Sequence, residues 1–176
     1  MAATQKDSGK KGDELTTMED LYLEQLRDLY SAENQIIDAL PKMAKVAQSP
    51  QLKQGFEKHL EETRQQAKRL EQIFQTIGQK PGGHTCKAMK GLIAEAQETL
   101  ASGQPSPVLD AALIASAQRV EHYEMAGYGS ARTFAKHLND TESISLLEQT
   151  LQEEKDTDQK LTQIAESQVN AQAARQ

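Results

Sequence analysis

Hydrophobic residues recur along most of the chain at the three- and four-residue spacing of an amphipathic helix. Long helices are therefore predicted over residues 18–47, 50–77, 107–138 and 141–167. Ser-Pro pairs at 49–50 and 106–107 combine a preferred N-cap residue with proline at the first helical position, and Asp140 is the N-cap of the last helix. The pattern predicts an all-α protein.

The connections between these helices differ in length. The first pair and the last pair are joined by a few residues, whereas residues 78–106 separate the pairs and contain the helix-breaking run Lys80-Pro-Gly-Gly83. A short amphipathic helix that ends at Gly103 lies within this middle segment. Short loops join antiparallel neighbours, and one long crossover is typical of ferritin-like bundles. We therefore expect a ferritin-like antiparallel four-helix bundle with a long crossover containing one short extra helix.

An internal repeat supports this topology. When the chain is shifted by 91 residues without gaps, Glu33 falls on Glu124 and the cap Ser49 falls on the cap Asp140. Coincident caps and a coincident glutamate on the apolar stripe indicate a duplicated helical hairpin. The repeat predicts a pseudo-two-fold axis through the bundle, with an off-centre site formed mainly by the third and fourth long helices and by Glu33.

Composition sets limits on the protein class. The chain has 176 residues, 4% aromatic residues and a net charge of −6, which disfavours a nucleic-acid partner. The start of the chain lacks the apolar core of a signal peptide, and no apolar run approaches a membrane span. We expect a cytoplasmic protein with a flexible polar tail (1–17), a bundle (18–168) and a fraying C-terminal tail (169–176).

The candidate functional residues are glutamates that lie on the apolar stripes of the predicted helices. Glu33 lies between Leu29 and Ile36, Glu124 is its equivalent in the second half, and the last helix presents Glu154 with Asp158 one turn later. Inward carboxylates repel one another unless they share protons or bind metal. Hard oxygen ligands in a bundle core suit Fe or Mn.

Other interpretations remain open at this stage. A glutamate at the edge of a stripe is often solvated or paired with a cation, and either Glu121 or Glu124 can face the core. Ferritin-type sites use Glu-x-x-His, whereas the second helix offers only His59 with Glu62. A metal-free bundle would instead hydrogen-bond its core carboxylates, with tyrosine donors expected at Tyr22, Tyr30 and Tyr123.

Several ordered motifs resemble the YciE/YciF family of bacterial ferritin-like stress proteins. They are Asp28-Leu-Tyr-Ser-Ala-Glu33, His59-Leu-Glu-Glu-Thr63, Cys86-Lys-Ala-Met-Lys-Gly-Leu-Ile93, Val120-Glu-His-Tyr-Glu124 and Glu153-Glu-Lys-Asp-Thr-Asp158. The resemblance implies a homodimer, a dinuclear metal site and a role in stress. It assigns ferritin-type carboxylates to Glu33, to Glu121 or Glu124, and to Glu154. Thr63, Gln66 and Thr157 occupy positions where ferritins have glutamate or histidine.

The sequence therefore predicts a bacterial stress-response protein with a dinuclear Fe or Mn centre and redox activity linked to peroxide or oxygen. The alternative is a non-catalytic helical dimer that acts as a scaffold or binds a partner without metal. A DNA-protecting miniferritin shell is disfavoured by the negative charge. The candidate metal ligands are Glu33, His59, Glu62, Glu121, Glu124, Glu154 and Asp158.

Overall fold

The computed structural model describes residues 15–176, and helices account for most of them. The elements are α1 (Met18–Val46), α2 (Pro50–Thr76), α3 (Lys87–Ser102), α4 (Pro107–His137), α5 (Thr141–Ile164), the π-helical turn η1 (Ala165–Val169) and α6 (Asn170–Ala173). Thr17 caps α1 through a reciprocal capping box with Asp20. The predicted tail over 1–17 lies largely outside the described residues.

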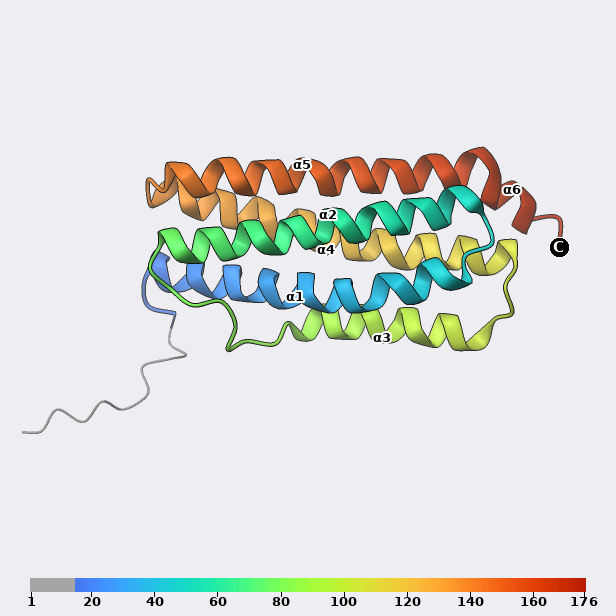
Figure 1. The fold of residues 1–176 in the computed structure, drawn as a ribbon, viewed down its shortest axis with the longest axis horizontal. Helices are drawn as coiled ribbons and strands as arrows, with labels where there is room; N and C mark the ends of the chain where they lie inside the picture. The colour runs from blue at the N-terminus through green and yellow to red at the C-terminus, as the bar shows by residue number, and fades with distance from the viewer. Residues whose placement is uncertain (1–14) are drawn as a thin grey trace, which may run out of the picture.

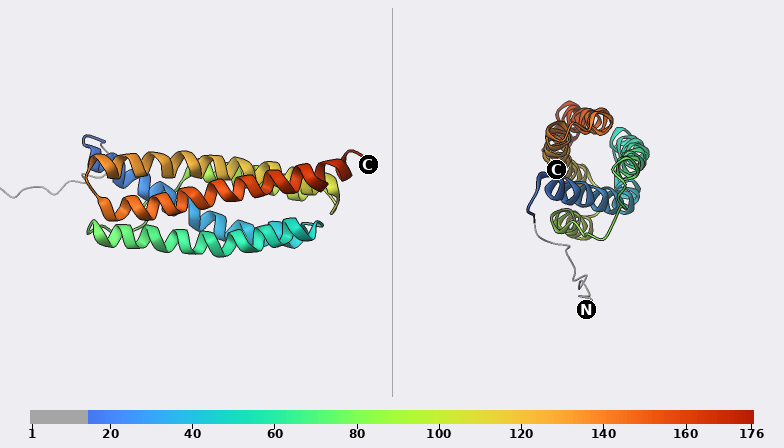
Figure 2. Two further views of the ribbon diagram at one scale, coloured as in Figure 1. Left: turned by 90° about the horizontal axis from the view of Figure 1, so that it is seen from above. Right: turned by 90° about the vertical axis from the view of Figure 1, so that its left-hand side faces the viewer.

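Four long helices form the bundle in the described part of the chain. Helix α1 packs against α2 and α4, and α5 packs against the same two helices. Neighbouring helices run in opposite directions (Figure 1). The crossover helix α3 lies outside the bundle, against α1 and α4 (Figure 2). The predicted ferritin-like bundle, with one short extra helix in its crossover, is confirmed.

The two hairpins match in their helix limits. Adding 91 to the bounds of α1 (18–46) gives 109–137, which lies within α4 at 107–137. Adding 91 to the bounds of α2 (50–76) gives 141–167, which α5 and η1 cover together at 141–169. The predicted caps are both present, because the Ser49 and Asp140 side chains accept backbone N–H groups at the starts of α2 and α5. The duplication therefore extends to local structure.

The C-terminal segment is helical beyond the predicted end of the last long helix. Helical structure continues through η1 and α6 to Ala173, beyond the boundary expected at residue 168. Val169 is buried and belongs to the hydrophobic core. The apolar contact of Val169 explains why the helix does not end at the predicted boundary. Within residues 15–176, none of the helices combines the length and apolarity that crossing a bilayer requires.

The apolar core consists of two clusters along the bundle axis. One includes Ile36, Phe56 and Leu113, and the other includes Leu26, Phe74 and Leu147. Between the two clusters along each long helix lies a belt of buried polar residues. Its members are Glu33, His59, Thr63, Gln66, Glu121, Glu124 and Glu154. The belt positions a polar site at mid-bundle, enclosed at both ends by apolar packing.

Candidate metal centre

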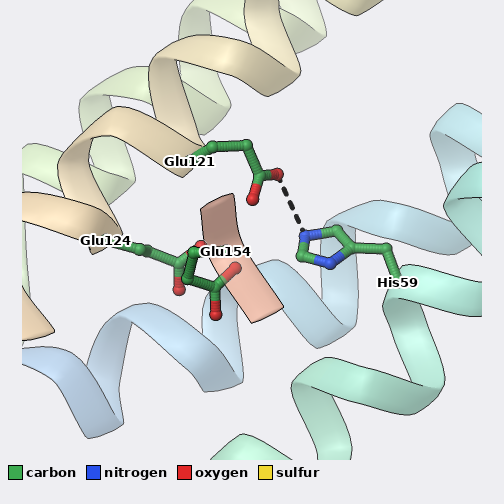
Figure 3. Close-up of side chains that lie close together, drawn as sticks. All are labelled: His59, Glu121, Glu124 and Glu154. Carbon is green, nitrogen blue, oxygen red and sulfur yellow. Dashed lines mark ion pairs between the residues drawn. The ribbon is translucent and has the colours of Figure 1, made fainter. Parts of the chain in front are cut away.

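Four belt residues from three helices converge on the bundle interior (Figure 3). Glu121 and Glu124 are i, i+3 neighbours on α4 and therefore share one helix face. Glu154 comes from α5, and His59 reaches in from α2. The three glutamates are 0% exposed and His59 is 3% exposed. Both Glu121 and Glu124 face the core, although the sequence left the choice between them open.

The four side chains are close enough to surround one cation. One ligand atom from each residue can be chosen so that all four lie within 4.8 Å of one another. Two ligands on opposite sides of a metal ion, with bonds of about 2.1 Å, lie about 4.2 Å apart. Only a small contraction would therefore bring all four atoms to coordination distance.

Hydrogen bonding leaves the centre unsatisfied. His59 Nε2 lies 3.2 Å from Glu121 Oε1, but the two atoms lack the alignment of a hydrogen bond. Neither oxygen of Glu121, Glu124 or Glu154 has a hydrogen-bond partner, and neither ring nitrogen of His59 has one. Buried polar groups without partners are costly. The cluster therefore requires protons or a cation.

Glu33 on α1 lies beside this cluster. Its Oε1 accepts a hydrogen bond from the Tyr128 hydroxyl, and its Oε2 has no hydrogen-bond partner. Its charge acts on Glu124 and Glu154 and raises the pKa of each. Glu33 is thus a fifth buried ligand candidate, adjacent to the group of four.

Burial and mutual repulsion control ionisation in the centre. Burial raises the pKa of Glu33 from 4.5 to about 8, although the Tyr128 hydrogen bond and His59 oppose the shift. The pKa values of Glu124 and Glu154 rise well above the ordinary value, first through burial and then through neighbouring carboxylates. Burial, the largest single influence, lowers the pKa of His59, but the carboxylates of Glu121, Glu33 and Glu62 together outweigh it, so the pKa is raised. Without metal, the centre retains protons at neutral pH.

Two predicted ligands lie outside the cluster. The Glu62 carboxylate pairs with Lys58 Nζ at 2.6 Å on the partly exposed side of α2. Asp158 accepts a hydrogen bond from Gln118 at 3.1 Å and lies 3.4 Å from His122. Each lies about one helical turn from an inward residue, so both were plausible on sequence periodicity alone. In the structure, however, their side chains contact surface partners.

Two of the three positions where the resemblance expected glutamate or histidine, Thr63 and Gln66, are buried but neutral, and the third, Thr157, is half-buried. The Thr63 hydroxyl donates to the His59 carbonyl oxygen at 2.8 Å within α2. The Gln66 amide donates to Glu153 at 3.2 Å. These two residues extend the polar belt without adding charge. Helix α2 therefore contributes one buried ionisable side chain, His59, and α5 contributes one, Glu154.

Tyr128 donates to a core carboxylate, a role that the sequence pattern did not predict for it. The tyrosines expected as donors to core carboxylates bond elsewhere: Tyr30 to Glu71 and Tyr123 to Asp28. Tyr22 approaches Asp140 at 3.5 Å. Tyr128 lies four residues after Glu124, on the same face of α4. That spacing was the available signal for its inward orientation.

The long bundle, the external crossover and the buried carboxylates at mid-bundle define a ferritin-like protein with a candidate metal centre. Comparison with known proteins specifies the family. Residues 17–174 match the domain of unknown function DUF892. The chain is 45% identical over 160 residues to Protein YciF of Escherichia coli K12, covering 90% of this chain and 96% of YciF. It belongs to the YciF family within DUF892, as the motifs predicted.

Solved structures agree with this assignment. The E. coli stress protein YciF matches with a TM-score of 0.85 and 45% identity, over 89% of this chain and 99% of that one. YcfI from Rhodopseudomonas palustris, described as a candidate structural protein, matches with a TM-score of 0.81 and 49% identity, over 84% and 94%. A Xanthomonas campestris protein shares the fold alone, at 20% identity and a TM-score of 0.72.

Proposed function

We propose that this protein binds a dinuclear Fe or Mn centre in the middle of its bundle. The observation that carries the proposal is the set of eight buried side-chain N and O atoms of His59, Glu121, Glu124 and Glu154 that lack hydrogen-bond partners. Buried groups of this kind need protons or a cation, and a divalent ion satisfies several at once. The arrangement of four ligand atoms within 4.8 Å supports the first ion.

The donor set fits the proposed metals. Carboxylates and one imidazole suit Fe and Mn, whereas soft metals prefer thiolates. Glu33, with its unpartnered Oε2, supplies a further carboxylate oxygen for a second ion. The negative charges of four glutamates also favour two divalent cations over one. Glu62 and Asp158 have no part in this proposal.

The chain's own residues define what the centre can do. Bound Fe or Mn supplies one-electron chemistry toward peroxide or dioxygen. The apolar clusters on both sides of the belt exclude water, and the Tyr128 hydroxyl holds a proton at Glu33 Oε1. We propose that this redox activity serves the stress response, because the E. coli relative is described as a stress protein.

Metal analysis tests the proposal directly. Protein purified from medium supplemented with Fe or Mn should contain up to two ions per chain by elemental analysis. Added Fe(II) or Mn(II) should raise the melting temperature of chelator-treated protein, because metal binds only the folded state. The variant Glu154→Gln removes one of the four converging ligands. Its matched control is Glu148→Gln, on the exposed side of α5. Metal-free protein with no thermal shift under either metal would contradict the proposal.

A metal-free scaffold is the second candidate function. Its supporting observation is that Glu33, Glu124 and Glu154 have raised pKa values, so a protonated centre can remain buried without an ion. The Rhodopseudomonas relative is also described as a candidate structural protein. In this second candidate function, the protein is a homodimer that acts as a scaffold or binds a partner without metal. Gel filtration tests the dimer, and the metal analysis above separates the two candidates.

A further inference from the structure

A narrow pocket between α1, α3 and α4 leads from the surface toward the candidate metal centre. Its lining runs from exposed Lys42 and Gln97 to buried His59 and Glu121, so it reaches the belt from the side of the bundle rather than along the bundle axis. The free volume is only about 30 Å³, which is close to the volume that one molecule occupies in liquid water. The pocket therefore admits a molecule of about the size of water and excludes larger ones.

The crossover helix α3 forms the outer wall of this pocket. Ile93, Ala96 and Leu100 contribute this wall, and residues such as Ile36 and Ala117 contribute the walls of α1 and α4. These side chains are apolar, and packed apolar side chains leave little room to adjust. The width of the route is therefore set by the volumes of the side chains on α3 and on the two bundle helices that it covers.

The inner end of the pocket offers hydrogen-bonding groups. His59 Nε2 and Glu121 Oε1 form an ion pair at 3.2 Å, but His59 Nδ1 and Glu121 Oε2 have no hydrogen-bond partner. Both side chains are almost fully buried, so neither unpaired atom is compensated by bulk water. A small molecule that donates and accepts hydrogen bonds satisfies such atoms, whereas dioxygen has no hydrogen to donate.

We propose that this pocket is the entry route for hydrogen peroxide and that it selects hydrogen peroxide by size against organic hydroperoxides. Hydrogen peroxide is only slightly larger than water, so it passes walls that stop a tert-butyl group, and its O–H groups then bond at His59 and Glu121. Reduction of the peroxide at the centre rests on the proposed metal-dependent function. Entry and size selection do not, because the chain alone forms the pocket.

Methionine oxidation reports which peroxides enter. Met43 lines the pocket and is 6% exposed, Met18 is 39% exposed at the surface, and Met89 is 0% exposed and outside the lining. The thioether sulfur takes one oxygen from the peroxide, the O–O bond breaks, and water or tert-butanol is released as the sulfoxide forms. Chelator-treated full-length protein is incubated with hydrogen peroxide or tert-butyl hydroperoxide, and the sulfoxide at each methionine is followed by peptide mass spectrometry.

The oxidation rate of Met43 should depend strongly on the size of the peroxide. After each rate is divided by the rate at Met18, which removes the difference in intrinsic reactivity, hydrogen peroxide should oxidise Met43 at least about tenfold faster than tert-butyl hydroperoxide. Met89 should react much more slowly than Met43, which excludes general unfolding as the cause. Equal normalised rates for the two peroxides would overturn the proposal, and so would oxidation of Met43 by hydrogen peroxide no faster than that of Met89.

Variants of α3 should change the selection in both directions. Ala96→Leu should narrow the pocket and slow the oxidation of Met43 by hydrogen peroxide, with Ala94→Leu on the exposed side of α3 as the matched control. Ile93→Ala should widen the pocket and let tert-butyl hydroperoxide oxidise Met43, with Leu92→Ala outside the lining as the matched control. If Ala96→Leu does not fold, the second pair of variants decides alone. Rates at Met43 that match those of the control variants would reject the route.

Metal content separates the entry route from the proposed function. It is measured on the same preparations before chelator treatment. Size-selective oxidation of Met43 in protein that binds neither Fe nor Mn would support the route while the metal proposal fails. Oxidation of Met43 without size selection in protein that does bind metal would reject the route and leave the metal proposal intact.

Discussion

The two hairpins of this bundle share a backbone plan but differ in the chemistry of their middle turns. Helices α1 and α2 correspond to α4 and α5 after a shift of 91 residues, with matching caps. The C-terminal hairpin contributes Glu121, Glu124 and Glu154 to the centre, whereas the N-terminal hairpin contributes Glu33 and His59. The fold is therefore close to two-fold symmetric, while the candidate centre is not.

Residue by residue, the asymmetry arises at a few positions. Glu121 corresponds to Tyr30, whose hydroxyl bonds to Glu71 at 2.9 Å outside the centre. Glu154 corresponds to Thr63, whose hydroxyl bonds within its own helix. Helix limits depend on caps and apolar stripes, which both halves retain. The chemistry depends on single buried side chains, which can change without altering the helices.

Removal of the C-terminal carboxylates should have the largest effect. The double substitution Glu124→Gln with Glu154→Gln should abolish Fe(II) or Mn(II) binding, because two of the four converging ligands are lost. Glu33→Gln should weaken binding only about tenfold, since its carboxylate lies outside the group of four. Isothermal titration calorimetry measures both. Equal losses in the two variants would show that the hairpins contribute equally and would contradict the asymmetric centre.

The stability of the metal-free protein should fall as pH rises. Glu33 has a folded pKa of about 8, above its ordinary value of 4.5. Its protonated form therefore stabilises the fold fully below about pH 4.5, and this contribution is lost as pH rises toward 8. A rise of the pKa from 4.5 to about 8 corresponds to about 5 kcal/mol when fully expressed. Urea unfolding of chelator-treated protein at pH 5 and pH 8 measures it, and Glu33→Gln should flatten the profile relative to Glu148→Gln.

A glutamate at Thr63 would make the two hairpins alike at this position. It should lower the stability of the metal-free protein, and bound metal should reverse that loss. Thr63→Glu places a carboxylate at the position equivalent to Glu154, in a fully buried site. The metal-free variant should lose about 3 kcal/mol of stability, because the added charge has no partner. Added Mn(II) should recover most of that loss. Thr63→Gln is the neutral control, and a loss that metal does not reverse would argue against a metal at this side of the belt.

The smallest effects are expected at the two predicted ligands that lie outside the cluster. Glu62→Gln and Asp158→Asn alter only partly exposed contacts with Lys58, Gln118 and His122. Each should change the free energy of unfolding by about 0.5 kcal/mol or less. Metal affinity by calorimetry should match that of the unmodified protein. A tenfold loss of affinity in either variant would place that residue in the centre after all.

Local signals account for what the sequence determined by itself. Apolar periodicity, the caps at Ser49, Ser106 and Asp140, and the long middle connection specified the helices and the ferritin-like topology. These features depend on near neighbours along the chain and can be read without a structure. The apolar stripes also identified Glu33 and Glu154 as inward residues, because a carboxylate flanked by buried positions shares their face, but they left the choice between Glu121 and Glu124 open.

Only the tertiary structure decided which other side chains meet them. Residues three apart on a helix differ by about 60° in direction, so Glu121 and Glu124 both reach the interior once α4 is oriented by its neighbours. His59 approaches Glu121 across the diagonal between α2 and α4, and no spacing along one helix encodes that distance. Glu62 and Asp158 contact surface partners instead, because spacing along one helix does not fix which way the helix faces in the bundle. The rotation of each helix about its axis is set by packing against the others, and that rotation determines the composition of the centre.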